Sequence, residues 1–353
     1  MQSLASCGLG FARLVSILSL VAMAAFSSQV SQAAEVWTDI CSPLLTRLTN
    51  NGAKAAYPGG CSGVVVNRTN GHVTIKVVGF GLWRSADQGK NWERIDGNTI
   101  SGRDETGWAT SADANSPDRI ATFSLDGTAG WTADGREWQR FTSLGRNWDY
   151  GSVDWASPTP KTIIAVKHET TPAGEVYATS DGGKTWNKLS ILVGGNRDKI
   201  GMVGTMDATT FVYCKGEGIH RSTDSGATWT PVSPANPQTR IPVLFQGVNY
   251  LGGTNGLLVS KDKGASWQAQ GEPVNIWQGP FFGRDEKEML IVGKDGAFST
   301  KDAGTHWKKV ADLKPKQGGF LFTPNWFGCY GWDPVGNVLF ASSMGNPVYQ
   351  LKL

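Results

Sequence analysis

The stretch Ser85-Ala86-Asp87-Gln88-Gly89-Lys90-Asn91-Trp92 decides the fold, because its pattern, S/T-x-D-x-G-x-x-W, returns along the chain. Four further full copies follow, together with one copy, Thr132 to Trp138, that is one residue short. The aspartates of the six copies are Asp87, Asp134, Asp181, Asp224, Asp262 and Asp302. They are 47, 47, 43, 38 and 40 residues apart, a period that suits a four-stranded sheet repeated around a ring. The repeat predicts an all-β propeller.

The residue types of the motif indicate a structural role. The aspartate accepts backbone N–H groups in a tight turn, the glycine supplies a positive φ, and the tryptophan packs its large ring between neighbouring sheets. We expect each copy to join the third and fourth strands of a blade. Six copies argue against catalysis by these aspartates, since an active site needs one constellation of residues.

The six copies resemble the Asp-box (BNR) repeats of sialidases, xyloglucan-active hydrolases, sortilin-type receptors and photosystem II assembly factors. The resemblance covers nearly the whole chain after residue 33 and implies the propeller fold, but these families have unrelated functions. Sialidases carry an Arg-Ile-Pro motif before their first box, whereas Arg240-Ile241-Pro242 comes late in this chain. Xyloglucan-active hydrolases of this kind usually pair two propellers around a cleft, and this chain predicts one.

Extending each box backwards into strands predicts the blades. Six of them fall at about 61–96, 107–143, 151–190, 199–233, 241–270 and 279–313. Residues 320–353 supply three further strand-like runs and Glu35 to Ile40 supplies a fourth. We therefore predict a seventh blade closed by both ends of the chain, which leaves no open sheet edge. Six blades with a C-terminal appendage is the alternative.

Composition and the N-terminal segment bound the class of protein. Arg13 precedes an apolar run, Leu14 to Phe26, and Ser31-Gln32-Ala33 suits a signal peptidase. We predict a signal peptide over residues 1–33, a single propeller domain over 34–353 and a secreted or periplasmic location. No later apolar run is long enough to span a membrane. The 45 glycines and 15 tryptophans of the chain are typical of many short strands and tight turns. The net charge is only +3, so a nucleic-acid partner is not expected.

The cysteines leave disulfides open. Cys41 and Cys61 are the local pair, and an exported protein permits a bond between them. A buried free thiol is an equal alternative for Cys214, which lies in an apolar strand. No Cys/His spacing suits a metal, and we expect neither a metal nor a cofactor.

The blade layout places the loops between blades on the face opposite the boxes, where aromatic residues accompany charged and polar ones. Flat rings stack on sugar faces, and planar polar groups bind hydroxyls and carboxylates. Our candidate substrate-binding residues are Arg103, Trp108, Arg146, Trp148, Trp277 and Arg240.

Two catalytic hypotheses use residues of the same loops. A pair of carboxylates would hydrolyse a glycosidic bond, or a histidine and a tyrosine would move protons while an arginine neutralises a uronate, as in a polysaccharide lyase. The candidates are Asp104, Glu105, Asp149, Tyr150, His168 and Glu169. Alternatively, His168 only satisfies loop carbonyls.

The sequence thus favours a carbohydrate-binding propeller that is a glycoside hydrolase, a polysaccharide lyase or a binding protein acting on a polysaccharide or oligosaccharide. The alternative is a non-enzymatic assembly scaffold with a protein partner, resembling photosystem II assembly factors.

Overall fold

A computed structural model describes residues 36–50, 54, 56–142, 145–170, 174–191, 201–313 and 326–353. The predicted signal peptide and its cleavage site lie outside these residues. The described part of the chain holds no helix with the length and apolarity needed to cross a lipid bilayer.

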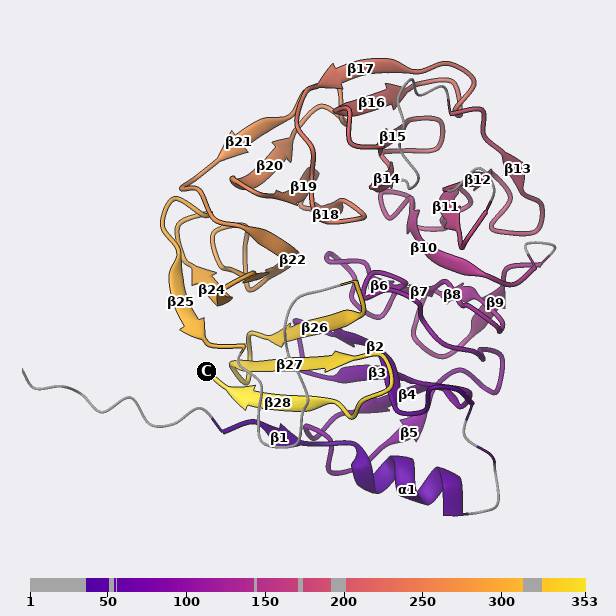
Figure 1. The fold of residues 1–353 in the computed structure, drawn as a ribbon, viewed down its shortest axis with the longest axis vertical. Coiled ribbons are helices and arrows are strands. Elements are labelled where there is room, and N and C mark those ends of the chain that lie inside the picture. Colours follow the sequence, from indigo (N-terminus) through magenta and orange to yellow (C-terminus); the bar gives the residue numbers. More distant parts are fainter. Residues whose placement is uncertain are drawn as a thin grey trace, which may run out of the picture. The chain divides into compact units, whose positions relative to one another are not determined.

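The described residues form seven four-stranded antiparallel sheets, which are arranged as blades around a common centre (Figure 1). The inner strands of blades 1 to 7 are β2 (Cys61–Val66), β6 (Thr110–Ala112), β10 (Trp148–Val153), β14 (Met202–Thr205), β18 (Val243–Phe245), β22 (Ile276–Phe282) and β26 (Gly328–Asp333). The second strands are β3 (Val73–Val77), β7 (Ile120–Thr122), β11 (Ile163–Lys167), β15 (Phe211–Cys214), β19 (Val248–Gly253), β23 (Met289–Gly293) and β27 (Val338–Ser343).

In blades 1 to 6 the third and fourth strands follow the first two directly along the chain, whereas the fourth strand of blade 7 comes from the N-terminal end. The third strands are β4 (Gly81–Ser85), β8 (Gly130–Thr132), β12 (Val176–Thr179), β16 (Ile219–Ser222), β20 (Gly256–Ser260), β24 (Gly296–Thr300) and β28 (Tyr349–Lys352). The outer strands are β5 (Glu93–Arg94), β9 (Trp138–Arg140), β13 (Asn187–Lys188), β17 (Thr230–Ser233), β21 (Gln268–Gln270), β25 (Lys308–Ala311) and, for blade 7, β1 (Thr38–Asp39).

Blade 7 is closed by the two ends of the chain, as predicted. β1 pairs antiparallel with β28, with Thr38 opposite Gln350 and Asp39 opposite Tyr349. The N–H of Ile40 then donates to the carbonyl of Val348 over 3.0 Å. The predicted seven-bladed propeller is therefore confirmed, and the six-bladed alternative is wrong.

The box turns have the hydrogen bonds that their residue types predict. In the blade 4 turn, Asp224 Oδ1 accepts the N–H of Thr228 over 2.9 Å, and Ser222 Oγ accepts the N–H of Gly226 over 2.8 Å. Gly226 has φ +86°, which a residue with a Cβ adopts only at a cost. In the short copy, Asp134 accepts the N–H of Glu137 instead, one residue earlier.

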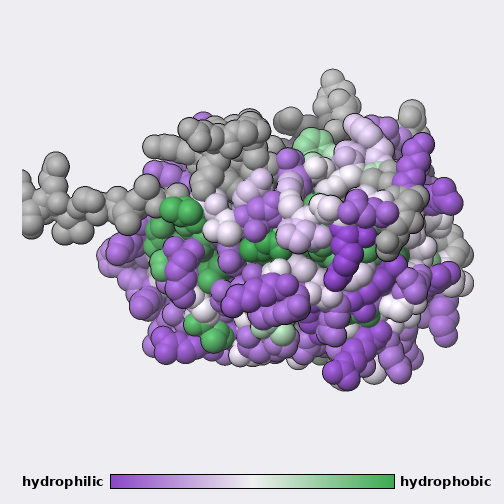
Figure 2. Space-filling view, turned by 90° about the horizontal axis from the view of Figure 1, so that it is seen from below, coloured by the Kyte–Doolittle hydropathy of each residue, from purple (hydrophilic) through white to green (hydrophobic). Residues whose placement is uncertain are grey.

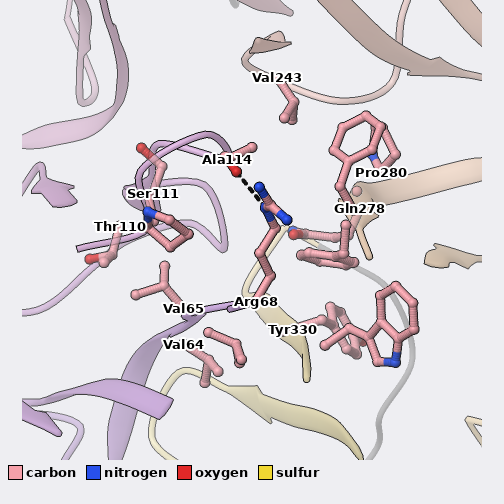
Figure 3. A pocket seen from close by; sticks show the side chains of 18 of the residues that line it. Val64, Val65, Arg68, Thr110, Ser111, Ala114, Val243, Gln278, Pro280 and Tyr330 are labelled. Atoms are coloured by element: carbon pink, nitrogen blue, oxygen red, sulfur yellow. Dashed lines mark hydrogen bonds between the residues drawn. The ribbon is translucent and has the colours of Figure 1, made fainter. Parts of the chain in front are cut away.

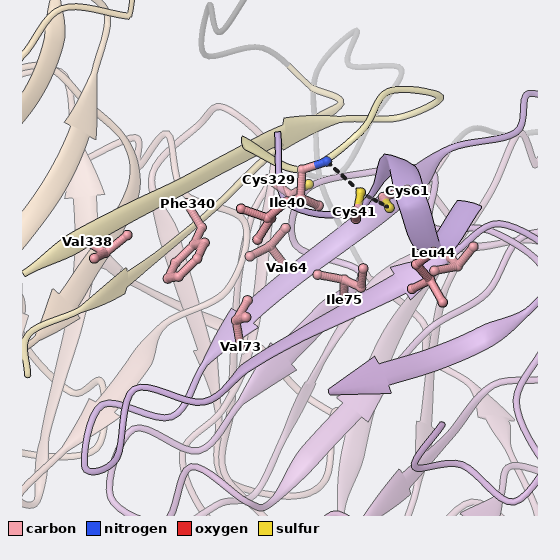
Figure 4. Packing of buried hydrophobic residues seen from close by; sticks show 12 residues of the cluster. Ile40, Cys41, Leu44, Cys61, Val64, Val73, Ile75, Cys329, Val338 and Phe340 are labelled. Atoms are coloured by element: carbon pink, nitrogen blue, oxygen red, sulfur yellow. Dashed lines mark hydrogen bonds between the residues drawn. The ribbon is translucent and has the colours of Figure 1, made fainter. Parts of the chain in front are cut away.

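The hydrophobic core lies between adjacent sheets. In the cluster between blades 7 and 1, Ile40 and Phe340 pack against Val64 and Val73 (Figure 4). The box tryptophans dock on the preceding blade: Trp138 Nε1 of blade 2, for example, donates to the carbonyl of Ile95 over 3.1 Å. Because each blade is packed on both faces, the blades hold one another in place.

One element was not predicted. Helix α1 (Ser42–Asn50) follows β1, and its Leu44 is buried in the core cluster between blades 7 and 1. The Asp39 carboxylate accepts the N–H groups of Cys41 and Ser42, each over 2.9 Å, at the start of the helix. Viewed from the edge that carries β1 and α1, the coloured surface is mostly hydrophilic with small apolar patches (Figure 2).

The structure places Cys41 and Cys61 in contact, but as free thiols. Their sulfur atoms lie 3.6 Å apart, well beyond the roughly 2.05 Å of a disulfide bond. The Cys41 sulfur instead accepts the N–H of Val348 over 3.0 Å. The predicted disulfide is thus absent from this structure, and Cys214 is a buried free thiol.

Ring closure can be tested at Trp37, which is 7% exposed and packs on Trp332 and Leu351 of blade 7 and on blade 6. We expect Trp37→Ala to lower the free energy of unfolding by about 3–5 kcal/mol, because it leaves a large cavity. The neighbouring Val36 is 68% exposed, so Val36→Ala is a matched control that should change little. Equal stability of both variants in urea denaturation would contradict closure by the N-terminal segment.

The structural role of the box aspartates can be tested at Asp224. Hydrogen bonds from Thr228 hold its pKa at about 2, below the ordinary 3.8. The carboxylate therefore stabilises the fold above pH 3.8, and this contribution disappears as the pH falls through 2. We expect Asp224→Ala to lower the melting temperature at pH 7 and to lower it much less at pH 2. A melting temperature that is unchanged at pH 7 would refute the role.

Candidate functional site

Two strands of blade 3 end side by side on the face opposite the boxes. β10 begins at Trp148, β11 ends at Lys167, and the register of the pair slips between Trp148 and Tyr150. Both Trp148 and Tyr150 are buried, whereas the Asp149 side chain between them keeps some exposure. A bulge of this kind redirects a side chain, and here the carboxylate of Asp149 meets the imidazole of His168.

The imidazole of His168 is oriented by its neighbours. Its Nδ1 lies 2.7 Å from Asp149 Oδ1, and its backbone N–H donates to the carbonyl of Asn147 over 2.8 Å. When Nδ1–H donates to a carboxylate, Nε2 is left as the acceptor, which is how an acid–base histidine is oriented. Glu169 Oε1 lies 3.5 Å from Nε2, on a side chain that is 82% exposed. The alternative that His168 only satisfies loop carbonyls does not describe its ring contacts.

Glu105 reaches the same place from the loop that enters blade 2. Its side chain is only 14% exposed. Burial raises the pKa of this carboxyl above its ordinary 4.5, and the charges of Asp149 and Glu169 raise it further against the opposing effect of His168 and Arg103. Its buried Oε2 has no hydrogen-bond partner among the described residues. Glu105 is thus a carboxyl that keeps its proton to higher pH than usual.

Arg103 completes the group. Its Nε lies 3.7 Å from Glu105 Oε2, and its Nη1 forms an ion pair with Asp126. Its guanidinium carbon lies 5.7 Å from the centre of the Tyr57 ring, and Tyr57 is 81% exposed. We call Arg103, Glu105, Asp149, His168 and Glu169 the rim cluster.

The rim cluster can move protons. A carboxyl with a raised pKa suits a general acid, and a carboxylate-oriented imidazole suits a general base. The charge of Arg103 suits a carboxylate, and the exposed ring of Tyr57 suits a sugar face. Among the described residues, no group of three or more His, Cys, Asp or Glu side chains is placed to hold a metal ion.

Asp104, the neighbour of Glu105, points the other way. Its carboxylate lies 2.6 Å from Lys76 Nζ, and both side chains are fully buried. Thr110 Oγ1 also donates to it. This ion pair ties the entry of blade 2 to β3 of blade 1, so Asp104 has no access to a ligand in this structure.

The predicted aromatic contacts are mostly part of the core. Trp148 is 1% exposed and packs edge-on against Tyr177 with ring centres 5.5 Å apart. Tyr150 is fully buried, and burial raises its pKa, which does not suit a proton donor to a substrate. Trp108 is 6% exposed. The proposed stacking of a sugar on Trp148 is therefore not possible in this structure.

The remaining predicted residues are not part of the rim cluster. Arg240 stacks on Trp326 and Trp108, with its guanidinium carbon 4.9 Å and 5.7 Å from the ring centres. Arg146 is exposed, and Trp277 is half-buried in β22 of blade 6. Loop residues within 192–200 and 314–325 lie outside the described residues.

Two aromatic residues on this face were not among the predicted site residues. Tyr57 contacts Arg103, and Trp326 lies edge-on to both Trp108 and Tyr150, with ring centres 6.1 Å and 6.0 Å apart. Their positions in loops directly before inner strands are the signal that could have indicated them.

Comparisons with known proteins find distant similarities. No protein-family model matches the chain. A probable oligoxyloglucan-reducing end-specific xyloglucanase of Neosartorya fischeri is 25% identical over 196 residues, which cover 45% of this chain and 24% of that protein. The chain thus spans about a quarter of the length of that curated relative.

Two solved structures are also similar. An ancestral GH74 enzyme matches with a TM-score of 0.46 and 14% identity, over 84% of this chain and 46% of that one. YCF48 from Cyanidioschyzon merolae matches with a TM-score of 0.44 and 13% identity, over 90% of this chain and 98% of that one. The chain is an Asp-box β-propeller with similarity to both kinds of protein, and these matches do not decide its function.

The two adjacent carboxyl groups predict opposite effects on stability. We expect Asp104→Asn to lower the free energy of unfolding by about 3–5 kcal/mol, because it leaves the buried charge of Lys76 without its partner. Glu105→Gln should raise the melting temperature at pH 7, because folding raises the pKa of Glu105 and so penalises its charged form.

The sign of the Glu105 effect also fixes its pH dependence. A raised pKa in the folded state means that the wild type loses stability as the pH rises from 4.5 through the raised value. The gain from Glu105→Gln should therefore vanish below pH 4.5. Thermal unfolding of both variants from pH 3 to pH 8 checks this, and a destabilised Glu105→Gln variant at pH 7 would contradict the placement of Glu105.

Proposed function

We propose that this protein is an exported propeller that binds a polysaccharide on the face opposite its boxes and cleaves it with the rim cluster. The observation that carries this proposal is that Glu105, a carboxyl with a raised pKa, lies within electrostatic reach of the hydrogen-bonded Asp149–His168 pair. The expected signal peptide over residues 1–33 would bring the protein to polysaccharides outside the cytoplasm.

The residues favour elimination on a uronate-containing polysaccharide. His168 Nε2 would remove the proton from C5 of the uronate, Glu105 would protonate the leaving glycosidic oxygen, the C4–O bond would break and a C4=C5 double bond would form. A nearby guanidinium would neutralise the uronate carboxylate, with Arg103 beside Glu105 and the exposed Arg146 as the candidates. Tyr150 has no part in this scheme because it is buried.

Hydrolysis is the second candidate, and the similarity to the Neosartorya fischeri xyloglucanase favours it. It would use Glu105 as the acid and a second carboxylate to activate water or to attack the sugar. Asp149 is already committed to His168 over 2.7 Å, and Glu169 is mostly exposed. These contacts suit a histidine base better than a free carboxylate pair.

The proposal predicts cleavage of a uronate polymer that depends on two side chains. The purified protein should be incubated with pectate, alginate and xyloglucan, while new reducing ends and the ultraviolet absorbance of an unsaturated uronate are measured. We expect both signals on a uronate polymer. His168→Gln and Glu105→Gln should each lower the rate by about 100-fold or more, whereas Glu93→Gln, at an exposed site in β5, should not.

The products distinguish the candidates. New reducing ends without the unsaturated product would identify hydrolysis. Cleavage that persists in the His168→Gln, Glu105→Gln double variant would show that the rim cluster is not the site. Binding without cleavage of any polymer would leave a carbohydrate-binding protein, and neither binding nor cleavage would favour the non-enzymatic scaffold.

A further inference from the structure

The central channel contains a cavity that the rim cluster does not line. Roughly 140 Å³ of free space lies between the inner strands of blades 1, 2, 5, 6 and 7. Its walls are mainly apolar, with side chains that include Val65, Trp108, Ile241, Phe281 and Trp332. Rigid apolar cavities with a few convergent polar groups are the usual form of a small-molecule site.

Arg68 places a single cationic side chain in this cavity, among the described lining residues. It follows β2 of blade 1, and Figure 3 shows its side chain projecting into the middle of the space, between Ala114 on one side and Gln278 on the other. A charge inside an apolar cavity is costly unless it is paired. Arg68 is partly buried, so its charge bears part of this cost.

Three other blades hold the guanidinium in a fixed orientation. Nε donates to the carbonyl of Ala114 in blade 2 over 2.7 Å, and Nη1 donates to the carbonyl of Gly283 in blade 6 over 2.8 Å. The guanidinium carbon lies 4.8 Å from the centre of the Phe245 ring in blade 5. Nη2 makes no hydrogen bond within the described residues, so one donor edge of a fixed cation is left for a ligand.

The charges around Arg68 leave the cavity positive. Asp113 also lines the cavity, but its carboxylate is engaged by Arg119 Nη1 over 2.7 Å. Burial lowers the pKa of Arg68 and the charge of Asp113 raises it, and a guanidinium stays protonated in either case. Because Arg119 offsets the charge of Asp113, Arg68 gives the apolar space one net positive charge.

We propose that the central channel binds a small aromatic carboxylate, with its carboxylate on Arg68 Nη2 and its ring between the apolar walls. The volume suits one ring, since a cavity of about 150 Å³ is known to hold benzene. A sugar suits it less, because the walls are mainly apolar and the polar side chains of Asp113 and Gln278 are already engaged by Arg119 and by the carbonyl of Gly328. The site is therefore independent of the polysaccharide proposed for the rim.

The test is calorimetric titration of the purified protein with three probes: phenylacetate, which has both groups, benzyl alcohol, which lacks the charge, and acetate, which lacks the ring. We expect phenylacetate to bind at least tenfold more tightly than either. Arg68→Met should weaken it at least tenfold, because a charge-assisted hydrogen bond is lost. Arg284→Met is the matched control, at a side chain in the neighbouring turn that is 86% exposed.

A second variant keeps the test valid if Arg68→Met fails to fold. Val65 lies in β2 and faces the cavity in Figure 3, and Val65→Phe fills the space while Arg68 stays in place. It should abolish binding. Absence of phenylacetate binding to the wild type, equal binding of benzyl alcohol, or unchanged binding to Val65→Phe would each overturn the proposal.

An aromatic ring beside a carboxylate also occurs at the C-terminus of a polypeptide that ends in phenylalanine, and such a chain end could reach the channel. A hexapeptide ending in a free phenylalanine carboxylate, with its amide as the control, separates this source from a free acid. The limited volume predicts no binding of either peptide, and binding of the free-carboxylate peptide as tight as that of phenylacetate would overturn the free acid as the occupant.

Discussion

The pairing of Thr38 and Asp39 with Gln350 and Tyr349 is the constraint on which the other features of the propeller depend. Each blade buries both of its faces against its neighbours, so an open ring would expose the face of one sheet and the edge of another. The pairing lets β1 complete blade 7 and brings Trp37 into the cluster with Trp332. Closure in turn fixes the inner strands, whose spacing forms the channel around Arg68.

The repeat made most of this architecture predictable, because the turn chemistry of each box is local. The hydrogen bonds of Asp224 and Gly226 stay within their own turn, so the sequence pattern contains the necessary information. Helix α1 depends instead on burying Leu44 against the closing blades. Nine residues between two strands give a weak local signal, and the partner surface exists only after the ring has closed.

The sequence predicts which loops form the candidate site, but not the directions in which their side chains point. The meander of each blade brings the entry of blade 2 and the end of β11 to one face, which predicts that Glu105 and His168 share that face. A topology does not show that Asp104 turns inward to Lys76 while Glu105 turns outward. Nor does it show the bulge at Asp149, which leaves both Trp148 and Tyr150 in the core.

The central claim is that burial raises the pKa of Glu105 beside an oriented histidine, and this pKa can be measured directly. The carbon resonance of its side-chain carboxyl should be followed by NMR from pH 3 to pH 9, with Glu105→Gln used to assign it. The structure predicts a midpoint above the ordinary 4.5, because desolvation is the dominant effect. A midpoint at or below 4.5 would mean that Glu105 is an ordinary ionised surface carboxylate, and the rim cluster would then lack its acid.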